Sequence, residues 1–176
     1  MAGALGIALN RQFEAHGVKG QLRYETASFI PTWAWSKKLP VYLAQYDPDL
    51  VVISLGTNEL QINNPEQRAK TIQRLVGRLE GRSCVWLAPP HLDAGDNGLR
   101  GIIRANCAPC AYVETDEIYP DMPRTSDKIH PTMSAREEWA RRVIDWLGAH
   151  RAPDGDRPWA LEADVIPPAP TAAAGK

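Results

Sequence analysis

Asp127 and His130 are the residues whose types and spacing most directly suggest chemistry. They lie three positions apart in the segment Asp127-Lys-Ile-His130-Pro131, which is expected to be a loop. On a loop the carboxylate can fold back onto the imidazole, fix its tautomer and leave the other ring nitrogen as a general base. An ordinary surface pair would have the same spacing, so the two residues alone leave both interpretations open.

A second candidate group follows the apolar run 50–55, in the sequence Gly56-Thr57-Asn58-Glu59. Asn58 carries an uncharged N–H donor, which suits the stabilisation of an oxyanion. Gly56 permits close backbone approach or an unusual dihedral angle. The same four residues also fit an ordinary turn, so whether they form part of a site depends on which residues lie beside them in the folded chain.

The three cysteines, Cys84, Cys107 and Cys110, include one C-x-x-C pair. Such a pair can be a redox motif, half a zinc site or a small disulfide loop. Here it precedes an expected strand instead of opening a helix after one, and no second pair completes a zinc site. We therefore expect buried thiols or one disulfide. Cys84 and Cys110 each lie where a strand begins, so these two could be bridged in an oxidising compartment.

His91, Asp93 and Asp96 follow Pro89-Pro90 and include residue types that bind metals. Their spacing matches no regular ligand set, so we expect a solvated loop and no metal at this position.

Hydrophobic periodicity divides the chain into alternating elements. A capping Asn64 ahead of Pro65 predicts the start of the clearest helix, and Ser134-Ala-Arg-Glu137 reads as a capping box for the last helix. Strand–helix alternation predicts parallel strands with helices on both faces, and chemistry beyond the carboxyl ends of the strands. The expected strands are 21–26, 50–55, 83–88 and 111–114, and the expected helices are 4–16, 37–46, 64–81, 99–106 and 134–149.

Composition sets the remaining bounds. The chain has 176 residues with 20 Lys and Arg against 21 Asp and Glu, so its formal net charge is −1. This balance argues against nucleic acid or an anionic membrane as the partner. The chain also lacks an apolar run of about 18 residues, the length needed to span a bilayer. We expect one domain over residues 1–150 and a Pro- and Ala-rich tail over 151–176, with Trp159 and Leu161 docking locally.

The combination is more specific than its parts. A buried strand ending in Gly-x-Asn-Glu, then Asp-x-x-His-Pro before a final helix, resembles the SGNH (GDSL-type) hydrolase family over roughly residues 1–149. The resemblance implies a three-layer α/β/α flavodoxin-like fold with a five-stranded parallel sheet. It also implies that Asp127 and His130 are the acid and base of a Ser-His-Asp triad, and that Asn58 is an oxyanion-hole donor. Backbone at Gly56, and an N–H of Ala27 or Ser28 where the family usually has glycine, would complete the oxyanion hole.

The resemblance lacks one essential part. The family's nucleophile lies in a Gly-Asp-Ser block between the first strand and first helix, whereas no serine here precedes Ser28. We expect that the sequence begins inside the family pattern and that the first strand and the nucleophile lie upstream. An export signal could lie there too, and it would place the protein in the periplasm or outside the cell. The alternative is a complete but altered relative, in which each buried backbone group left unpaired would cost about 1–3 kcal/mol.

The resemblance therefore predicts a serine ester hydrolase that acts on acyl esters, such as an acetylated carbohydrate, a lipid or a thioester. It implies no metal or organic cofactor and a small-molecule or carbohydrate ester as the partner. A non-catalytic acyl- or sugar-binding relative is the first alternative. A thiol redox protein built on Cys107 and Cys110 is the second.

Overall fold

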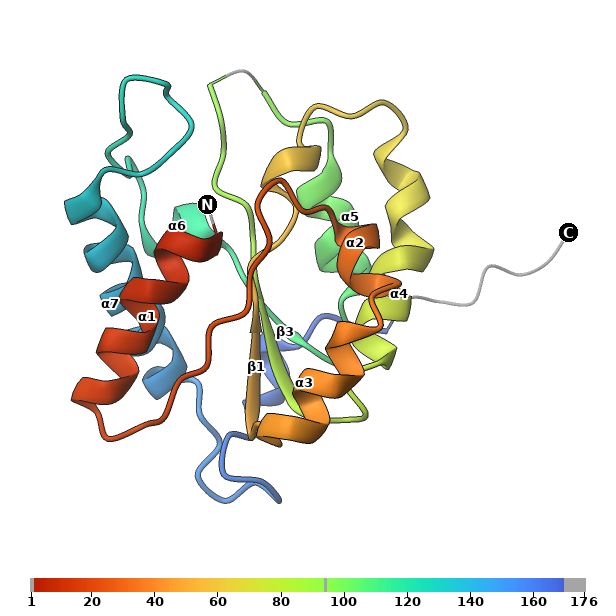
Figure 1. The fold of residues 1–176 in the computed structure, drawn as a ribbon, viewed down its shortest axis with the longest axis vertical. Coiled ribbons are helices and arrows are strands. Elements are labelled where there is room, and N and C mark those ends of the chain that lie inside the picture. Colours follow the sequence, from red (N-terminus) through yellow and green to blue (C-terminus); the bar gives the residue numbers. More distant parts are fainter. Residues whose placement is uncertain (1, 94, 170–176) are drawn as a thin grey trace, which may run out of the picture.

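The computed structural model describes residues 2–93 and 95–169 and contains one small parallel sheet (Figure 1). Its strands are β1 (Leu50–Ile53), β2 (Ser83–Leu87) and β3 (Ala111–Val113), hydrogen-bonded in the order β1-β2-β3. Val85 is the register partner of Val52 on one side and of Ala111 on the other. The described part of the chain thus has three parallel strands where the family resemblance implied five.

Helices cover both faces of this sheet, so the three-layer α/β/α architecture is confirmed (Figure 1). Alternate residues of β2 point into the two layers, with Trp86 in one core and Val85 and Leu87 in the other, as the two-residue period of a strand requires. One layer contains α1 (Ala2–Ala15) and α7 (Met133–Ala149); the other contains α2 (Ile30–Ala34), α3 (Lys38–Tyr46), α4 (Ala69–Gly77) and α5 (Leu99–Asn106).

The strand expected over 21–26 is not formed. A strand needs a neighbour to satisfy its backbone N–H and C=O groups, and among the described residues β1 pairs only with β2. The segment packs instead through its side chains, with Leu22 lying against Gly6 and the Tyr24 ring against Gly3 of α1. Strand β1 also departs from expectation, because most of its residues are only partly buried.

Two expected helix caps are wrong. Asn64 has φ 56° and makes no capping hydrogen bond, and the chain passes through a short 3-10 turn (Pro65–Arg68) before α4 begins. At the last helix the cap is Thr132, whose Oγ1 accepts the Ala135 N–H at 3.2 Å. Ser134 therefore lies inside α7.

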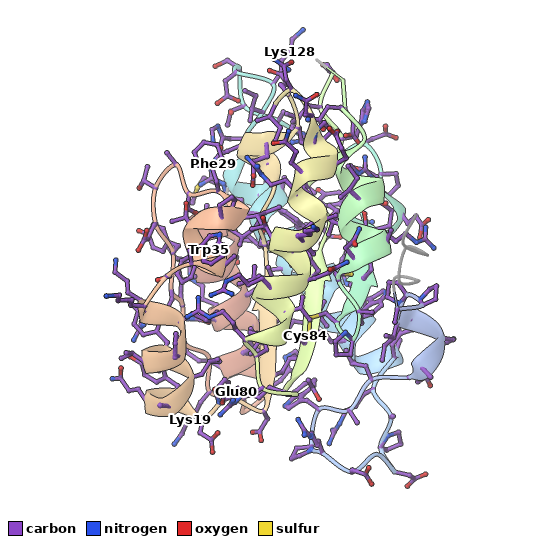
Figure 2. The ribbon with its side chains drawn as sticks, turned by 90° about the vertical axis from the view of Figure 1, so that its right-hand side faces the viewer. Lys19, Phe29, Trp35, Glu80, Cys84 and Lys128 are labelled. Carbon is purple, nitrogen blue, oxygen red and sulfur yellow. A yellow bond between two sulfur atoms is a disulfide. The ribbon has the colours of Figure 1, made fainter. Side chains whose placement is uncertain are left out.

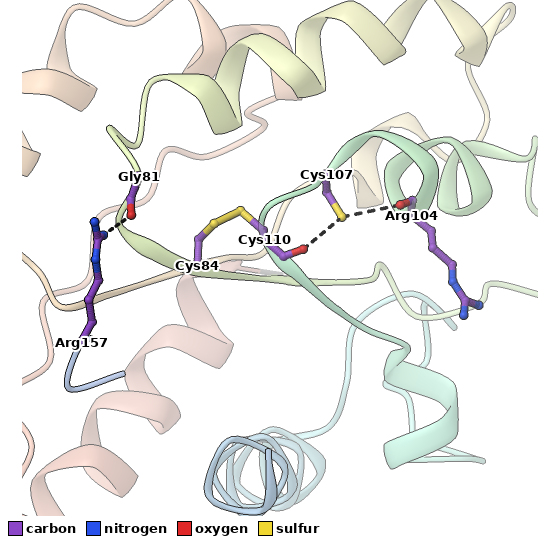
Figure 3. The surroundings of a disulfide bond; sticks show 6 residues. All are labelled: Gly81, Cys84, Arg104, Cys107, Cys110 and Arg157. Atoms are coloured by element: carbon purple, nitrogen blue, oxygen red, sulfur yellow. Dashed lines mark hydrogen bonds between the residues drawn. A yellow bond between two sulfur atoms is a disulfide. The ribbon is translucent and has the colours of Figure 1, made fainter. Parts of the chain in front are cut away.

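A disulfide joins Cys84 and Cys110, at the starts of β2 and β3 (Figure 3). Cys107 is free and fully buried, and burial raises the pKa of its thiol to about 12. Neither cysteine of the C-x-x-C pair is thus a reactive thiol. The expected Cys84–Cys110 bridge is confirmed, and the redox interpretation of Cys107 and Cys110 is wrong.

The chain beyond α7 folds back on the domain as far as it is described. Arg151 and Leu161 form an isolated bridge, and Trp159 and Leu161 pack against the core that α1 and α7 share. Arg157 donates to the carbonyl of Gly81 near the disulfide (Figure 3). The expected docking of Trp159 and Leu161 is confirmed, while residues 170–176 lie outside the described part. No helix among the described residues is long and apolar enough to cross a membrane.

The disulfide gives a first prediction. Replacing Cys84 and Cys110 together with alanine should lower the free energy of unfolding by about 2–4 kcal/mol, because the cross-link restricts the unfolded chain. Urea denaturation of this variant beside Cys107→Ala, which keeps the cross-link, measures the difference. In denaturant without reductant, one thiol per chain should react with Ellman's reagent; three reactive thiols would contradict the bridge.

Candidate active site

Residues 123–132 form the tight loop that carries the predicted acid and base. The Thr125 N–H donates to the His130 carbonyl at 2.7 Å, and the Thr132 N–H donates to the Pro123 carbonyl at 3.0 Å. Lys128 takes up φ 57° at the turn between them. The loop leads directly into α7, so His130 is anchored by a long, packed helix just after it.

Asp127 organises this loop through both carboxylate oxygens. Its Oδ1 accepts hydrogen bonds from the backbone N–H groups of Ile129 (2.8 Å) and His130 (2.9 Å) and from Thr125 Oγ1 (2.8 Å). Its Oδ2 lies 2.7 Å from His130 Nδ1. The side-chain hydrogen bond with His130, followed by the backbone donors, holds the pKa of the Asp127 carboxyl well below its usual range.

The sign of this shift fixes both the pH behaviour and the tautomer. A folded-state pKa below the unfolded value of about 3.9 means that Asp127 contributes stability above about pH 4 and loses it as the pH falls further. An ionised carboxylate only accepts hydrogen bonds, so Nδ1 of a neutral His130 carries the ring proton. Nε2 is then the basic nitrogen, and within residues 2–93 and 95–169 it has no hydrogen-bond partner.

Arg124 is a further residue of the candidate site, and sequence reasoning missed it. Its guanidinium donates to the Ile129 carbonyl at 2.7 Å and to the His91 carbonyl at 2.9 Å, which ties the acid–base loop to the loop after β2. Partial burial lowers the pKa of Arg124, although Asp116 and two other carboxylates oppose this effect. Nothing in the local sequence distinguishes this arginine, because both of its partners are backbone carbonyls.

The candidate metal residues do not converge. The described residues contain no group of three or more side chains that could hold a metal ion. His91 is held through its backbone, whose N–H donates to the Asp116 carboxylate, and Asp96 accepts the N–H of Gly98 ahead of α5.

Asn58 lies where β1 ends, in a short 3-10 helix (Thr57–Glu59) that Gly56 introduces with φ 115°. A side chain at position 56 would meet Pro89 and Ile103, so glycine lets the backbone pass close to the core. Asn58 Nδ2 donates to the Ser28 carbonyl at 3.0 Å. An amide NH₂ has two hydrogens, so the second N–H of Asn58 stays available to a ligand.

The segment 27–29 supplies the other candidate donor. Ala27 has φ 53°, a left-handed conformation that glycine adopts most easily. The Phe29 N–H donates to Thr32 Oγ1 at 3.1 Å. The N–H groups of Ala27 and Ser28, by contrast, have no acceptor in the described part of the chain. The free backbone donors thus lie at the two positions that the sequence indicated.

All of these groups lie at one end of the sheet. Figure 1 places the teal 120–132 loop, the orange 27–29 turn and the amber 57–59 turn at the top, where the strands end, together with the start of α1. In Figure 2, Phe29 and Lys128 lie toward that end, and Lys19 and Glu80 lie at the opposite one. The structure therefore places an imidazole with a free nitrogen and several N–H donors without acceptors among the described residues at the same end of the sheet.

Comparison with known proteins supports the fold. No protein-family model and no curated protein sequence matches the chain. Among solved structures, TesA superposes with a TM-score of 0.64 at 20% identity, covering 82% of this chain and 87% of TesA. A carbohydrate esterase family 3 protein from Talaromyces cellulolyticus gives 0.62 at 12% identity, covering 83% and 89%. A putative GDSL-like lipase from Parabacteroides merdae ATCC 43184 gives 0.56 at 14% identity, covering 82% and 80%. The chain has the SGNH/GDSL hydrolase fold.

The acid–base pair gives a second prediction. Asp127→Asn keeps one acceptor oxygen, which the N–H groups of Ile129 and His130 should hold, so its NH₂ faces Nδ1 and a neutral His130 should lose its fixed tautomer. Nitrogen-15 and proton NMR of the imidazole should show a hydrogen-bonded Nδ1–H in the native chain and its loss in the variant. Ser126→Ala, in the same loop, is the control and should leave the signal in place. An unchanged tautomer in Asp127→Asn would contradict the assignment.

Proposed function

We propose that this protein is a serine ester hydrolase whose base is His130 and whose acid is Asp127. The observation that carries the proposal is the His130 Nε2 atom, which is oriented by the Asp127 carboxylate and has no partner in residues 2–93 and 95–169. A surface ion pair needs no such orientation, whereas a general base does. The fold shared with esterases supports the same class of reaction.

The chemistry follows from the positions of the donors and the base. Nε2 of His130 removes the proton of a serine hydroxyl as its oxygen bonds to the acyl carbon of the ester. Asp127 stabilises the imidazolium that forms. The free N–H of Asn58 and the Ser28 N–H donate to the oxyanion of the tetrahedral intermediate. His130 then passes its proton to the leaving alcohol or thiol, and water repeats the sequence to release the acid.

In residues 2–93 and 95–169 no serine hydroxyl is hydrogen-bonded to His130 Nε2. Ser28 Oγ accepts the Trp33 indole N–H at 3.3 Å, and Ser134 Oγ lies 3.2 Å from Thr132 Oγ1. We propose that the nucleophile belongs to a segment joined before α1, because α1 starts at the catalytic edge (Figure 1). A strand in that segment would pair along the edge of β1 that lacks a partner among the described strands.

The proposed substrates are small acyl esters, such as acetylated carbohydrates, lipids or thioesters. Solved neighbours of this fold include carbohydrate esterases of family 3 and an acetyl esterase mutant bound to an acetate ion. The dyad is about half exposed, which suits a substrate that approaches from solvent. The Cys84–Cys110 disulfide suits an oxidising compartment.

A non-catalytic acyl- or sugar-binding protein is the second candidate. It is favoured by one observation, namely that no hydroxyl lies within hydrogen-bond distance of His130 Nε2 in the described part of the chain. Unchanged ligand binding in His130→Ala, together with no turnover in any longer form of the chain, would select this candidate.

The third prediction concerns activity. The 176-residue chain should hydrolyse p-nitrophenyl acetate no faster than its His130→Ala variant, because no serine hydroxyl is hydrogen-bonded to His130 Nε2 in residues 2–93 and 95–169. A form extended upstream through a Gly-Asp-Ser block should be active, and His130→Ala should abolish that activity. In the extended form, Asn58→Ala should lower kcat by about 10²–10³-fold, the usual effect of one lost oxyanion donor.

Ser28→Ala is the matched control, since it keeps the Ser28 N–H and removes only the hydroxyl. It should leave the activity of the extended form nearly unchanged. Fast hydrolysis by the 176-residue chain that Ser28→Ala removes would overturn the assignment and identify Ser28 as the nucleophile.

A further inference from the structure

Glu59 is a buried carboxylate that the proposed reaction does not use. Its side chain is 0% exposed, and it follows Asn58 directly in the 3-10 helix after β1. A buried carboxylate costs several kcal/mol unless it is paired and hydrogen-bonded, so such a group persists only where its partners compensate for the loss of water. Its partners therefore indicate its role.

The Glu59 carboxylate joins two segments that are distant in sequence. Oε2 accepts the backbone N–H of Ile30 at 2.7 Å, and Oε1 accepts a hydrogen bond from Arg68 Nε in the turn before α4. Asn97 fixes the backbone beneath it, because Asn97 Nδ2 donates to the carbonyls of Glu59 (2.8 Å) and Ile62 (2.9 Å). The backbone next to Asn58 is thus held by Asn97 through its carbonyls and by Ile30 and Arg68 through the Glu59 carboxylate.

The Ile30 N–H depends on this carboxylate. Ile30 is the first residue of α2, and the first N–H groups of a helix have no acceptor within the helix. The Phe29 cap gives no side-chain acceptor, so Glu59 takes that place. Without it, a fully buried residue would carry an unsatisfied N–H, at a cost of about 1–3 kcal/mol.

Asn58 and Glu59 together hold the turn 28–30 at two points. Asn58 holds the Ser28 carbonyl from the solvent side, and Glu59 holds the Ile30 N–H from the core side. The Ser28 N–H lies on the same residue as the held carbonyl, just before these two points, and it has no acceptor in the described residues. Asn58 thus holds the residue that carries this N–H, and Glu59 holds the chain two residues after it, so two adjacent side chains of one short helix restrict where the N–H lies relative to the Asn58 amide.

We propose that Glu59 is a positioning residue that sets the spacing of the two oxyanion donors, the Asn58 side-chain amide and the Ser28 N–H. This inference rests on the proposed function for its catalytic meaning. The family block usually carries aspartate at this position. The additional methylene of Glu59 gives the side chain more reach, and here its carboxylate contacts both Ile30 and Arg68.

Two double variants isolate the Ile30 hydrogen bond from the buried charge. Glu59→Gln with Arg68→Gln removes the ion pair, yet the amide oxygen introduced at position 59 can still accept the Ile30 N–H. The amide NH₂ at the same position can donate to the side-chain carbonyl introduced at position 68. Glu59→Met with Arg68→Gln removes the charge and the acceptor together, at similar side-chain volume. The two variants differ in whether position 59 can bind the Ile30 N–H, and neither buries an unpaired charge.

Hydrogen exchange by NMR on the 176-residue chain is the first measurement. The Ile30 amide should exchange at least about tenfold faster in Glu59→Met/Arg68→Gln, as expected for the loss of a hydrogen bond of about 1.4 kcal/mol, and within about threefold of native in Glu59→Gln/Arg68→Gln. Amides of β2 and α5 should exchange at native rates in both. A uniform increase across β2 and α5, or equal Ile30 rates in the two variants, would overturn the proposal.

The second measurement uses the extended, active form. Glu59→Met/Arg68→Gln should lower kcat at least about tenfold with KM within about threefold, because a misplaced donor weakens transition-state binding above all. The double glutamine variant should retain most of kcat, and equal kcat values in the two variants would overturn the positioning role. If the extended native form is inactive, the proposed function fails, while the exchange experiment still decides whether Glu59 holds the turn.

Discussion

The hydrogen bond between Asp127 and His130 is the interaction on which the catalytic account depends. Its strength comes from the short loop around it, since Asp127 Oδ1 is already held by two backbone N–H groups and the Thr125 hydroxyl. The carboxylate cannot turn away from the imidazole without losing those bonds. Because the partners are three positions apart, closing the loop costs little conformational entropy. The pair therefore forms from local sequence and needs no substrate to orient it.

The proposed oxyanion donors are positioned in the opposite way. Asn58, Ser28 and Ile30 belong to segments separated in sequence, and buried side chains from further segments bring them together. Asn97 holds the backbone carbonyl of Glu59, next to Asn58, and Arg68 holds the Glu59 carboxylate. A local acid–base loop thus lies at the same end of the sheet as a group of donors that only the tertiary structure can assemble (Figure 1).

This contrast explains how much the sequence could predict. Local sequence patterns predict the pairing of Asp127 with His130, the buried strand β2, and cysteines at the starts of β2 and β3 that could form a disulfide. The structure contains each of these features. Arg124 and Glu59 could not be assigned roles, since each binds a backbone group of a segment distant in sequence, the His91 carbonyl and the Ile30 N–H. Thr132 was missed as the helix cap because Ser134 offered a similar local pattern.

The missing 21–26 strand has the same origin. The segment has the alternating pattern of a strand, but a strand forms only where a neighbouring strand accepts its hydrogen bonds. Here the segment packs on α1 through Leu22 and Tyr24 instead. The partly exposed residues of β1 mark the same edge of the sheet. Sequence pattern predicts which segments can be strands, and the available neighbours decide which of them become strands.

The most direct test of the proposed function is to find which hydroxyl, if any, depends on His130 for its reactivity. A fluorophosphonate, which bonds covalently to an activated serine, should label the extended chain at the serine before α1, as peptide mass mapping would show. His130→Ala should slow that labelling, and the 176-residue chain should take up no label. A rapid adduct on Ser28, Ser126 or Ser134 within the 176 residues would contradict the account.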